Sequence, residues 1–152
     1  MDDPRISRCL EPGMSILVGT VDERGRPSCC RAIALTSSDD LATVTAYVPV
    51  ATSRSVIADI AATRRMAIVA NQPIEHLSVQ LKGTTGTTRL AREDERQLVR
   101  DRIEAFGDVL EDLGVPRRIT RSITFWPAFA IDLQVEEIFE QTPGPKAGLR
   151  LR

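Results

Sequence analysis

MSILVGTVDERGRPSCCRAIALTSSDDLATVTAYV (residues 14–48) carries the strand and turn signals from which the fold is predicted. Two runs rich in apolar and β-branched residues, 14–21 and 27–36, flank a short connection that contains a glycine, which predicts a β-hairpin. The polar sequence 37–40 then turns the chain into a third strand, 41–48. We therefore expect three antiparallel strands joined by tight turns.

Arg31 is the unusual residue of the second strand. Successive side chains of a strand point to opposite sides, so the neighbours on its face are expected to be Cys29, Ile33 and Leu35. An arginine in an apolar row is rarely left unpaired. Two interpretations stay open: Arg31 lies near the end of a barrel or pairs with a carboxylate, or its guanidinium binds an anion.

Composition and charge are those of an ordinary globular chain. The 152 residues are 42% hydrophobic and 27% charged, which is enough for one core and too little for two typical domains. The net charge of −1 removes any general electrostatic attraction to nucleic acid or anionic membranes. No apolar run approaches the roughly 20 residues of a membrane helix, and the acidic N-terminus does not resemble a secretory signal. We expect a cytoplasmic protein that binds neither nucleic acid nor membranes.

Several common chemistries are absent from the pattern. The three cysteines do not form a disulfide framework, and we expect them to be reduced. His76 is the only histidine, which is too few for a recognisable metal site and excludes any histidine-dependent triad that does not use it. Neither a dinucleotide-binding glycine motif nor a P-loop is present. The sequence therefore predicts no metal, Rossmann or P-loop site.

The rest of the chain predicts two main helices and three further strands. Apolar residues recur at helical spacing from Ser53 to about Thr63 and again from Arg92 to Leu113. The expected strands are 66–70, 77–82 and 123–139, with 83–88 either a bulged continuation of the second of these or a loop. Six short antiparallel strands with two helices indicate a mainly β fold, a small barrel with helices at its openings, and a two-layer α+β sandwich is the alternative.

The domain organisation follows from these elements. We expect an N-terminal arm, residues 1–13, one barrel domain, residues 14–140, and a C-terminal tail, residues 141–152. The tail contains two prolines and two glycines, so it is expected to be extended or irregular. It could close over a groove or be disordered.

The start of the first main helix is a candidate anion site. Ser53, Arg54 and Ser55 combine free backbone N–H groups, the helix dipole, hydroxyls and a guanidinium, which together suit a phosphate. Arg31 could reach the same anion from a neighbouring strand. The alternative is that Thr52 or Ser53 only caps the helix and that Arg54 is solvated.

Three more polar or amphipathic side chains are candidates. Gln80 and Lys82 project from the polar face of a strand, where they could bind the polar edge of a ligand or simply be solvated. Trp126 is expected on an outward face of the last strand. Such a tryptophan marks an interface or a ligand surface, or lies partly buried under a loop.

Several of these segments, taken in order and spacing, resemble the pyridoxamine 5′-phosphate oxidase-like superfamily of flavin-binding split barrels. The segments are VGTVDERGRPS (18–28), RAIAL (31–35), YV (47–48) followed by TSR (52–54), and VQLKG (79–83). The resemblance covers roughly residues 10 to 140. It implies a six-stranded antiparallel split barrel that forms a homodimer, with FMN in the two grooves between the subunits.

The resemblance also implies which residues would bind the cofactor. Arg31 and Arg54, with Ser53 or Ser55, would hold the FMN phosphate. Ala32, Ile33, Tyr47 and Val48 would lie against the flavin, Gln80 and Lys82 would approach the flavin or its ribityl chain, and Trp126 would come from the partner chain. No side chain is identified as a catalytic acid or base.

One departure from the family pattern narrows the expected activity. True pyridoxamine phosphate oxidases follow the tryptophan with an Arg-x-His-type run that grips the substrate phosphate, and residues 127–136 lack such a run. We therefore expect an FMN-binding oxidoreductase that acts on a small molecule other than a B6 vitamer. The alternatives are a non-catalytic flavin- or haem-binding protein for sensing or storage, with His76 or a cysteine as haem ligand, an F420-dependent reductase, and a barrel without a cofactor.

Overall fold

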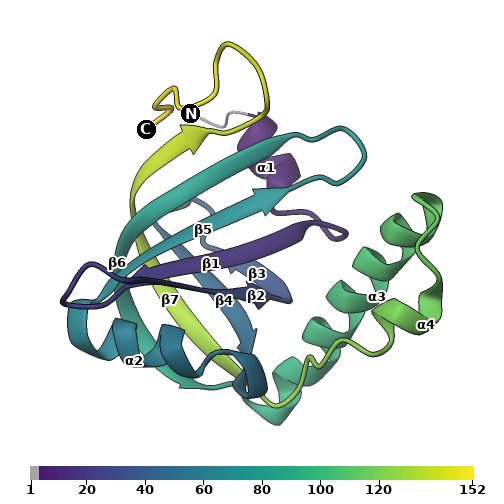
Figure 1. Cartoon of the computed structure of the whole chain (residues 1–152), viewed down its shortest axis with the longest axis horizontal. Coiled ribbons are helices and arrows are strands. Elements are labelled where there is room, and N and C mark those ends of the chain that lie inside the picture. The colour runs from purple at the N-terminus through teal and green to yellow at the C-terminus, as the bar shows by residue number, and fades with distance from the viewer. Residues whose placement is uncertain (1–3) are drawn as a thin grey trace.

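A computed structural model describes residues 4–152 (Figure 1). Its strands are β1 (Ser15–Val21), β2 (Pro27–Ala32), β3 (Ala34–Ser37), β4 (Thr43–Pro49), β5 (Arg65–Asn71), β6 (Ser78–Leu90) and β7 (Ala128–Glu140). Its helices are α1 (Pro4–Cys9), α2 (Arg54–Thr63), α3 (Arg96–Asp112) and α4 (Arg117–Thr120), with the 3₁₀ turns η1 (Val50–Thr52) and η2 (Glu93–Glu95).

The strands form one curled antiparallel sheet in the order β2-β1-β5-β6-β7-β4-β3. The fold is mainly β, as predicted, but the sheet has seven strands, so the predicted number of six is wrong. The predicted strand 27–36 breaks at Ile33 into β2 and β3, which lie at the two ends of the strand order. At the break the backbone N–H of Ile33 donates to the carbonyl oxygen of Tyr47 at 2.8 Å, because the curled sheet closes on itself there.

The break at Ile33 also changes the surroundings of Arg31. The core side of β2 carries Cys30 and Ala32, whereas Cys29 is exposed and Arg31 is half-buried on the outer side. The predicted apolar row around Arg31 is therefore wrong. Its guanidinium lies on the outer face of the sheet.

Apolar side chains fill the inside of the curl, and helices cover its ends. Val56 and Ile60 of α2 belong to this core, as do Ile6 and Cys9 of α1. Figure 1 shows α1 near one opening and α2 near the other. Burial raises the pKa of the Cys9 thiol to about 11, which favours the protonated form of a packed, reduced cysteine.

The long helix α3 lies outside the barrel, to one side of it with α4 (Figure 1). It packs over the seam at which β2 passes into β3. This second apolar cluster consists of Ile33, Ala34, Tyr47, Val99, Ile103, Phe106 and Ala130. The predicted helix from Arg92 to Leu113 is confirmed in position, with η2 forming its first turn.

Strand β6 continues through the glycine- and threonine-rich segment 83–88, with register shifts at Lys82/Gly83 and between Thr85 and Thr88. Of the two predictions for this segment, the bulged continuation is confirmed. A Cβ atom on Gly83 would lie 1.8 Å from the carbonyl oxygen of Gln134. Glycine is required there because the β6 and β7 backbones approach too closely for any side chain.

The C-terminal tail pairs with the end of β7. The Leu151 N–H donates to the Ile138 carbonyl at 2.7 Å, and Phe139 forms a bridge with Arg150. These contacts lie beyond the last residue of β7 that pairs with β4. The tail therefore occupies a sheet edge that β4 leaves open. No helix of the described chain is long and apolar enough to cross a membrane.

Candidate functional site

The start of α2 holds a buried hydroxyl without a partner. Ser53 is fully buried, its side chain does not cap the helix, and its Oγ atom has no hydrogen-bond partner among the described residues. Arg54 and Ser55, the first two residues of α2, are exposed. Unsatisfied buried polar atoms are rare in folded proteins, so this one requires an explanation.

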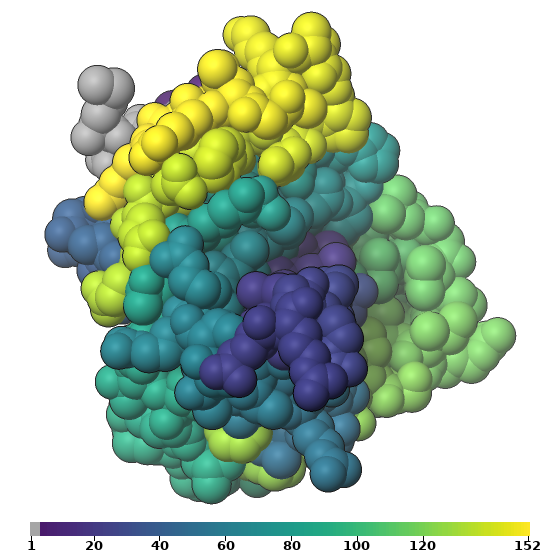
Figure 2. All heavy atoms as spheres, turned by 60° about the vertical axis from the view of Figure 1, so that its left-hand side comes forward, coloured from purple at the N-terminus to yellow at the C-terminus, as the bar shows by residue number. Residues whose placement is uncertain are grey.

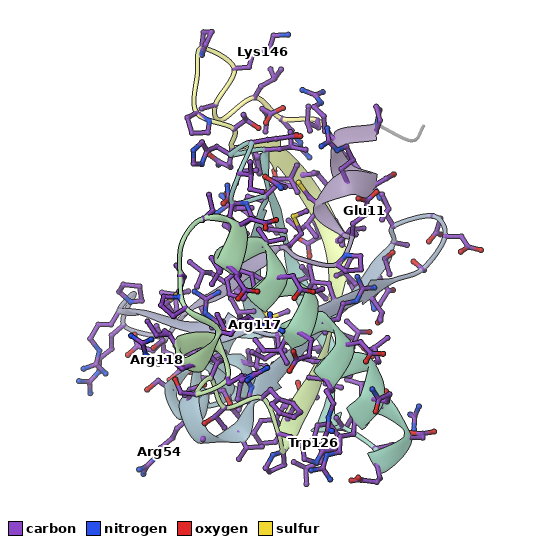
Figure 3. All side chains as sticks on the ribbon, turned by 90° about the vertical axis from the view of Figure 1, so that its right-hand side faces the viewer. Glu11, Arg54, Arg117, Arg118, Trp126 and Lys146 are labelled. Carbon is purple, nitrogen blue, oxygen red and sulfur yellow. The ribbon has the colours of Figure 1, made fainter. Side chains whose placement is uncertain are left out.

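Local sequence places this helix start beside the loop before β7. Strand β4 ends at Pro49, η1 follows, and the Val50 N–H donates to the Pro127 carbonyl at 2.9 Å. Trp126 is half-buried and lies in the loop before β7, so its predicted place on the last strand is wrong, because that strand begins only at Ala128. Figure 3 shows Arg54 and Trp126 at the same end of the molecule. The Arg96 guanidinium lies 5.8 Å from the Trp126 ring centroid.

The residues present at this helix start fit a phosphate. The first N–H groups of an α-helix have no intrahelical acceptor, and the Ser53 side chain does not accept from them. The helix dipole and the Arg54 guanidinium both favour an anion here. An oxyanion that accepted the Ser53 O–H would also satisfy the unpartnered atom.

The four residues predicted to lie against a flavin are buried in this chain. Ala32, Ile33, Tyr47 and Val48 are each at most 4% exposed. Ile33 and Tyr47 pack beneath α3, while Ala32 and Val48 belong to the core inside the curl. Their side chains are therefore fully used in packing.

A charged network holds the Tyr47 hydroxyl, and sequence reasoning missed it. Tyr47 donates to Glu95 at 3.0 Å, and Arg89 binds both carboxylate oxygens of Glu95 at 2.7 Å. The hydrogen bonds from Arg89 lower the pKa of Glu95 to about 2, and burial raises the pKa of Tyr47. Arg89 and Glu95 are close in sequence, but no periodic signal indicates the network, because Tyr47 joins them only through the fold.

The other predicted residues lie on the outer face of the sheet half that contains β2, β1, β5, β6 and β7. The register aligns two rows across these strands. The first row is Arg31, Leu17, Val69, Gln80 and Phe139, and the second is Cys29, Gly19, Ala67, Lys82 and Glu137. Figure 2 shows this face, with the β1–β2 hairpin in dark blue and β5 and β6 in teal.

The structure does not bring all the predicted residues together. Arg31 donates to Ser15 Oγ at 3.2 Å and lies 5.1 Å from the Phe106 ring centroid. Gln80 accepts from Gln141 at 3.3 Å. Because Arg31 and Gln80 are three strand spacings apart, roughly 14 Å, these two predicted contacts cannot meet at one small group within a single chain.

A shallow hollow of about 250 Å³ opens on the same face, lined by Gly19, Thr20, Val21, Arg65, Met66, Ala67 and Lys82. Only Lys82 of this set was singled out from the sequence. A glycine inside a strand pattern is the signal that could have located the hollow.

The described residues do not form a metal site, and His76 does not take part in one. His76 is exposed in the turn between β5 and β6, with a left-handed backbone angle φ of 60°. Residues 4–152 contain no group of three or more His, Cys, Asp or Glu side chains placed to hold a metal ion.

No protein-family model and no curated sequence matches the chain. Solved structures do resemble it. HupZ of group A Streptococcus is 18% identical, with 97% of this chain and 100% of that chain covered and a TM-score of 0.58. A Clostridium acetobutylicum protein related to general stress protein 26, of the pyridoxinephosphate oxidase family, is 14% identical over 96% and 90% of the two chains, with a TM-score of 0.53.

A structure described as an F420 reductase is 11% identical over 87% of this chain and 94% of that one, with a TM-score of 0.56. Identities this low show a shared fold and nothing more specific. The chain thus has the fold of the pyridoxamine 5′-phosphate oxidase-like split barrels, as the sequence motifs predicted.

Proposed function

We propose that this protein is a homodimeric FMN-binding oxidoreductase of the pyridoxamine phosphate oxidase-like type. The unpartnered Ser53 hydroxyl is the observation that carries the proposal. It lies at a helix start that also offers free N–H groups and the exposed Arg54. These groups would hold the FMN phosphate.

A second copy of the chain would complete the site. The outer face exposes Leu17, which is 41% exposed, beside the half-buried Val69 and Ala67. An apolar sheet face of this kind is typical of an interface. In the proposed dimer, Gln80 and Lys82 of one subunit would face the cofactor whose phosphate binds at α2 of the other, which explains why these residues do not meet within one chain.

The bound flavin would supply hydride or single-electron transfer. The protein would supply binding and orientation: Ser53 and Arg54 at the phosphate, and polar side chains of the outer face at the other end. Residues 127–136 contain no arginine or histidine, so a doubly charged substrate phosphate would find no clamp there. We therefore propose a substrate other than a B6 vitamer.

FMN titration of the purified protein and of Arg54→Ala tests the phosphate site. Loss of a charge-assisted hydrogen bond of about 1.5–3 kcal/mol should weaken FMN binding roughly 10- to 150-fold. Arg118→Ala, at an exposed arginine of α4, is the matched control and should leave the affinity unchanged. Equal affinity in wild type and Arg54→Ala would remove the phosphate site.

F420 is the second candidate cofactor, favoured by the structural likeness to an F420 reductase. It shares a tricyclic ring and a phosphate-bearing side chain with FMN but carries a longer anionic tail. A competition titration of the two cofactors on the same protein distinguishes them, since the physiological cofactor should displace the other.

A further inference from the structure

The hollow on the outer face is separate from the phosphate site. Val21 and Arg65, which line it, adjoin the C-terminal end of α2, where Thr63 donates to the Val21 carbonyl at 3.0 Å. Ser53 lies at the opposite end of this ten-residue helix, which is about 15 Å long. The hollow is therefore a surface feature distinct from the phosphate site.

Small residues form the floor of the hollow. Gly19 of β1 pairs with Ala67 of β5, so these two neighbouring strands place almost no side-chain volume there. A Cβ atom on Gly19 would have no other atom within 4 Å. The glycine is thus not required by packing, and its effect is to leave a flat, open floor.

The wall of the hollow contains two cationic side chains, Lys82 and Arg65. Lys82 has no carboxylate partner among residues 4–152, because the opposite residue, Glu137, pairs with Arg150 at 3.2 Å. Arg65, the second cation, is held by Glu136 at 3.0 Å. Lys82 is therefore the cation that remains available to a ligand.

An aromatic ring restricts this ammonium group. Its Nζ atom lies 4.7 Å from the centroid of the Phe139 ring, and the side chain is half-buried. A cation–π contact of this kind is partly desolvated, which strengthens its attraction for an anion. Lys82 and Lys146 are the only lysines among the twenty basic residues of the chain.

We propose that this hollow binds a planar aromatic carboxylate, with the carboxylate at Lys82 and the ring on the floor of Gly19 and Ala67. The proposal deepens the proposed function and rests on it in one respect: in the dimer, this ligand would be the small-molecule substrate, and its carboxylate would lie between Lys82 and the flavin that Lys82 faces. Binding of the carboxylate itself requires no flavin, so it is tested separately.

The test uses full-length protein without FMN, labelled with ¹³C on its lysine side chains. Two lysines give two side-chain signals, and the one shifted by the Phe139 ring current belongs to Lys82. Titration with benzoate should move the Lys82 signal saturably and leave the signal of Lys146 in place. Benzamide, the uncharged analogue, should move neither.

Two variants locate the binding. Gly19→Val should place a branched side chain on the floor where the ring is proposed to lie and so abolish the saturable shift. It is compatible with folding because the space is open and valine favours strands. Leu17→Val, on the same face of the same strand, should retain it. An absent shift in wild type, equal shifts of both lysines, or an unchanged shift in Gly19→Val would each overturn the proposal. Retention of benzoate binding in Arg54→Ala would separate this site from the FMN phosphate site.

Discussion

Replacement of Ser53 by alanine should raise the stability of the protein and lower its affinity for FMN. The Ser53 hydroxyl is fully buried and has no partner in the described chain. It does not cap α2, so its removal sacrifices no hydrogen bond of the free protein. A residue with a purely structural role would not be expected to raise stability and lower FMN affinity when it is replaced.

The size of both effects follows from the missing hydrogen-bond partner of the Ser53 hydroxyl. A buried donor without a partner costs about 1–3 kcal/mol, and its removal should recover about 1 kcal/mol or more. For a chain of this length, each kcal/mol corresponds to a rise of roughly 2–4 °C in the melting temperature. With FMN bound, the lost hydrogen bond to a phosphate oxygen should cost about 1.5–3 kcal/mol, or roughly 10- to 150-fold in affinity.

Thermal unfolding of the free protein and FMN titration measure both effects, and Thr20→Val is the matched control. The Thr20 hydroxyl is also buried but donates to the Asp59 carboxylate at 2.7 Å. Its loss should destabilise the protein by about 1–3 kcal/mol and leave FMN affinity unchanged. If Ser53→Ala lowers the melting temperature, or binds FMN as tightly as wild type, the assignment of the phosphate site is refuted.

Three further predictions concern the charged network, the β6–β7 contact and the dimer. The pKa of Glu95 is lowered from 4.5 to about 2, chiefly by Arg89. The contribution of the ionised Glu95 to folding stability is therefore complete above pH 4.5 and is lost as the pH falls toward 2. The difference in unfolding free energy between wild type and Glu95→Gln should shrink over that window, and a constant difference would contradict this prediction. Gly83→Ala should destabilise the protein by about 3 kcal/mol or more because its Cβ would clash with backbone, whereas Gly19→Ala should change stability by less than about 0.5 kcal/mol; equal denaturant midpoints for the two variants would refute the close approach. Leu17→Glu should convert the proposed dimer to a monomer in sedimentation analysis, and a dimer of unchanged affinity would show that this face is not the interface.

The sequence predicted the elements that local patterns determine and missed those that closure of the sheet determines. The hairpin, helix α2 and the alternation along β6 follow from short-range periodicity and turn residues. The break at Ile33 does not, because the apolar run is continuous through it, and the chain changes its pairing partner there from β1 to β4. Burial of Tyr47 under α3 was invisible for the same reason.

The candidate site likewise has features that local sequence predicted and features that only tertiary packing determines. A serine, an arginine and a second serine before an apolar helical pattern located the start of α2. That the Ser53 hydroxyl is buried and fails to cap the helix is a property of the packing. Alternation placed Gln80 and Lys82 on an outer face. The hollow beside Lys82 depends on Gly19, which is remote in sequence and is brought near Lys82 only by β5 between them.

Sedimentation of the purified chain mixed with FMN, followed in the flavin absorption band, tests whether the protein is an FMN-binding homodimer. Flavin should sediment with a species of twice the subunit mass and reach one FMN per subunit at saturation. Flavin that remains at the meniscus while the protein sediments would contradict the account, as would flavin bound to a monomer.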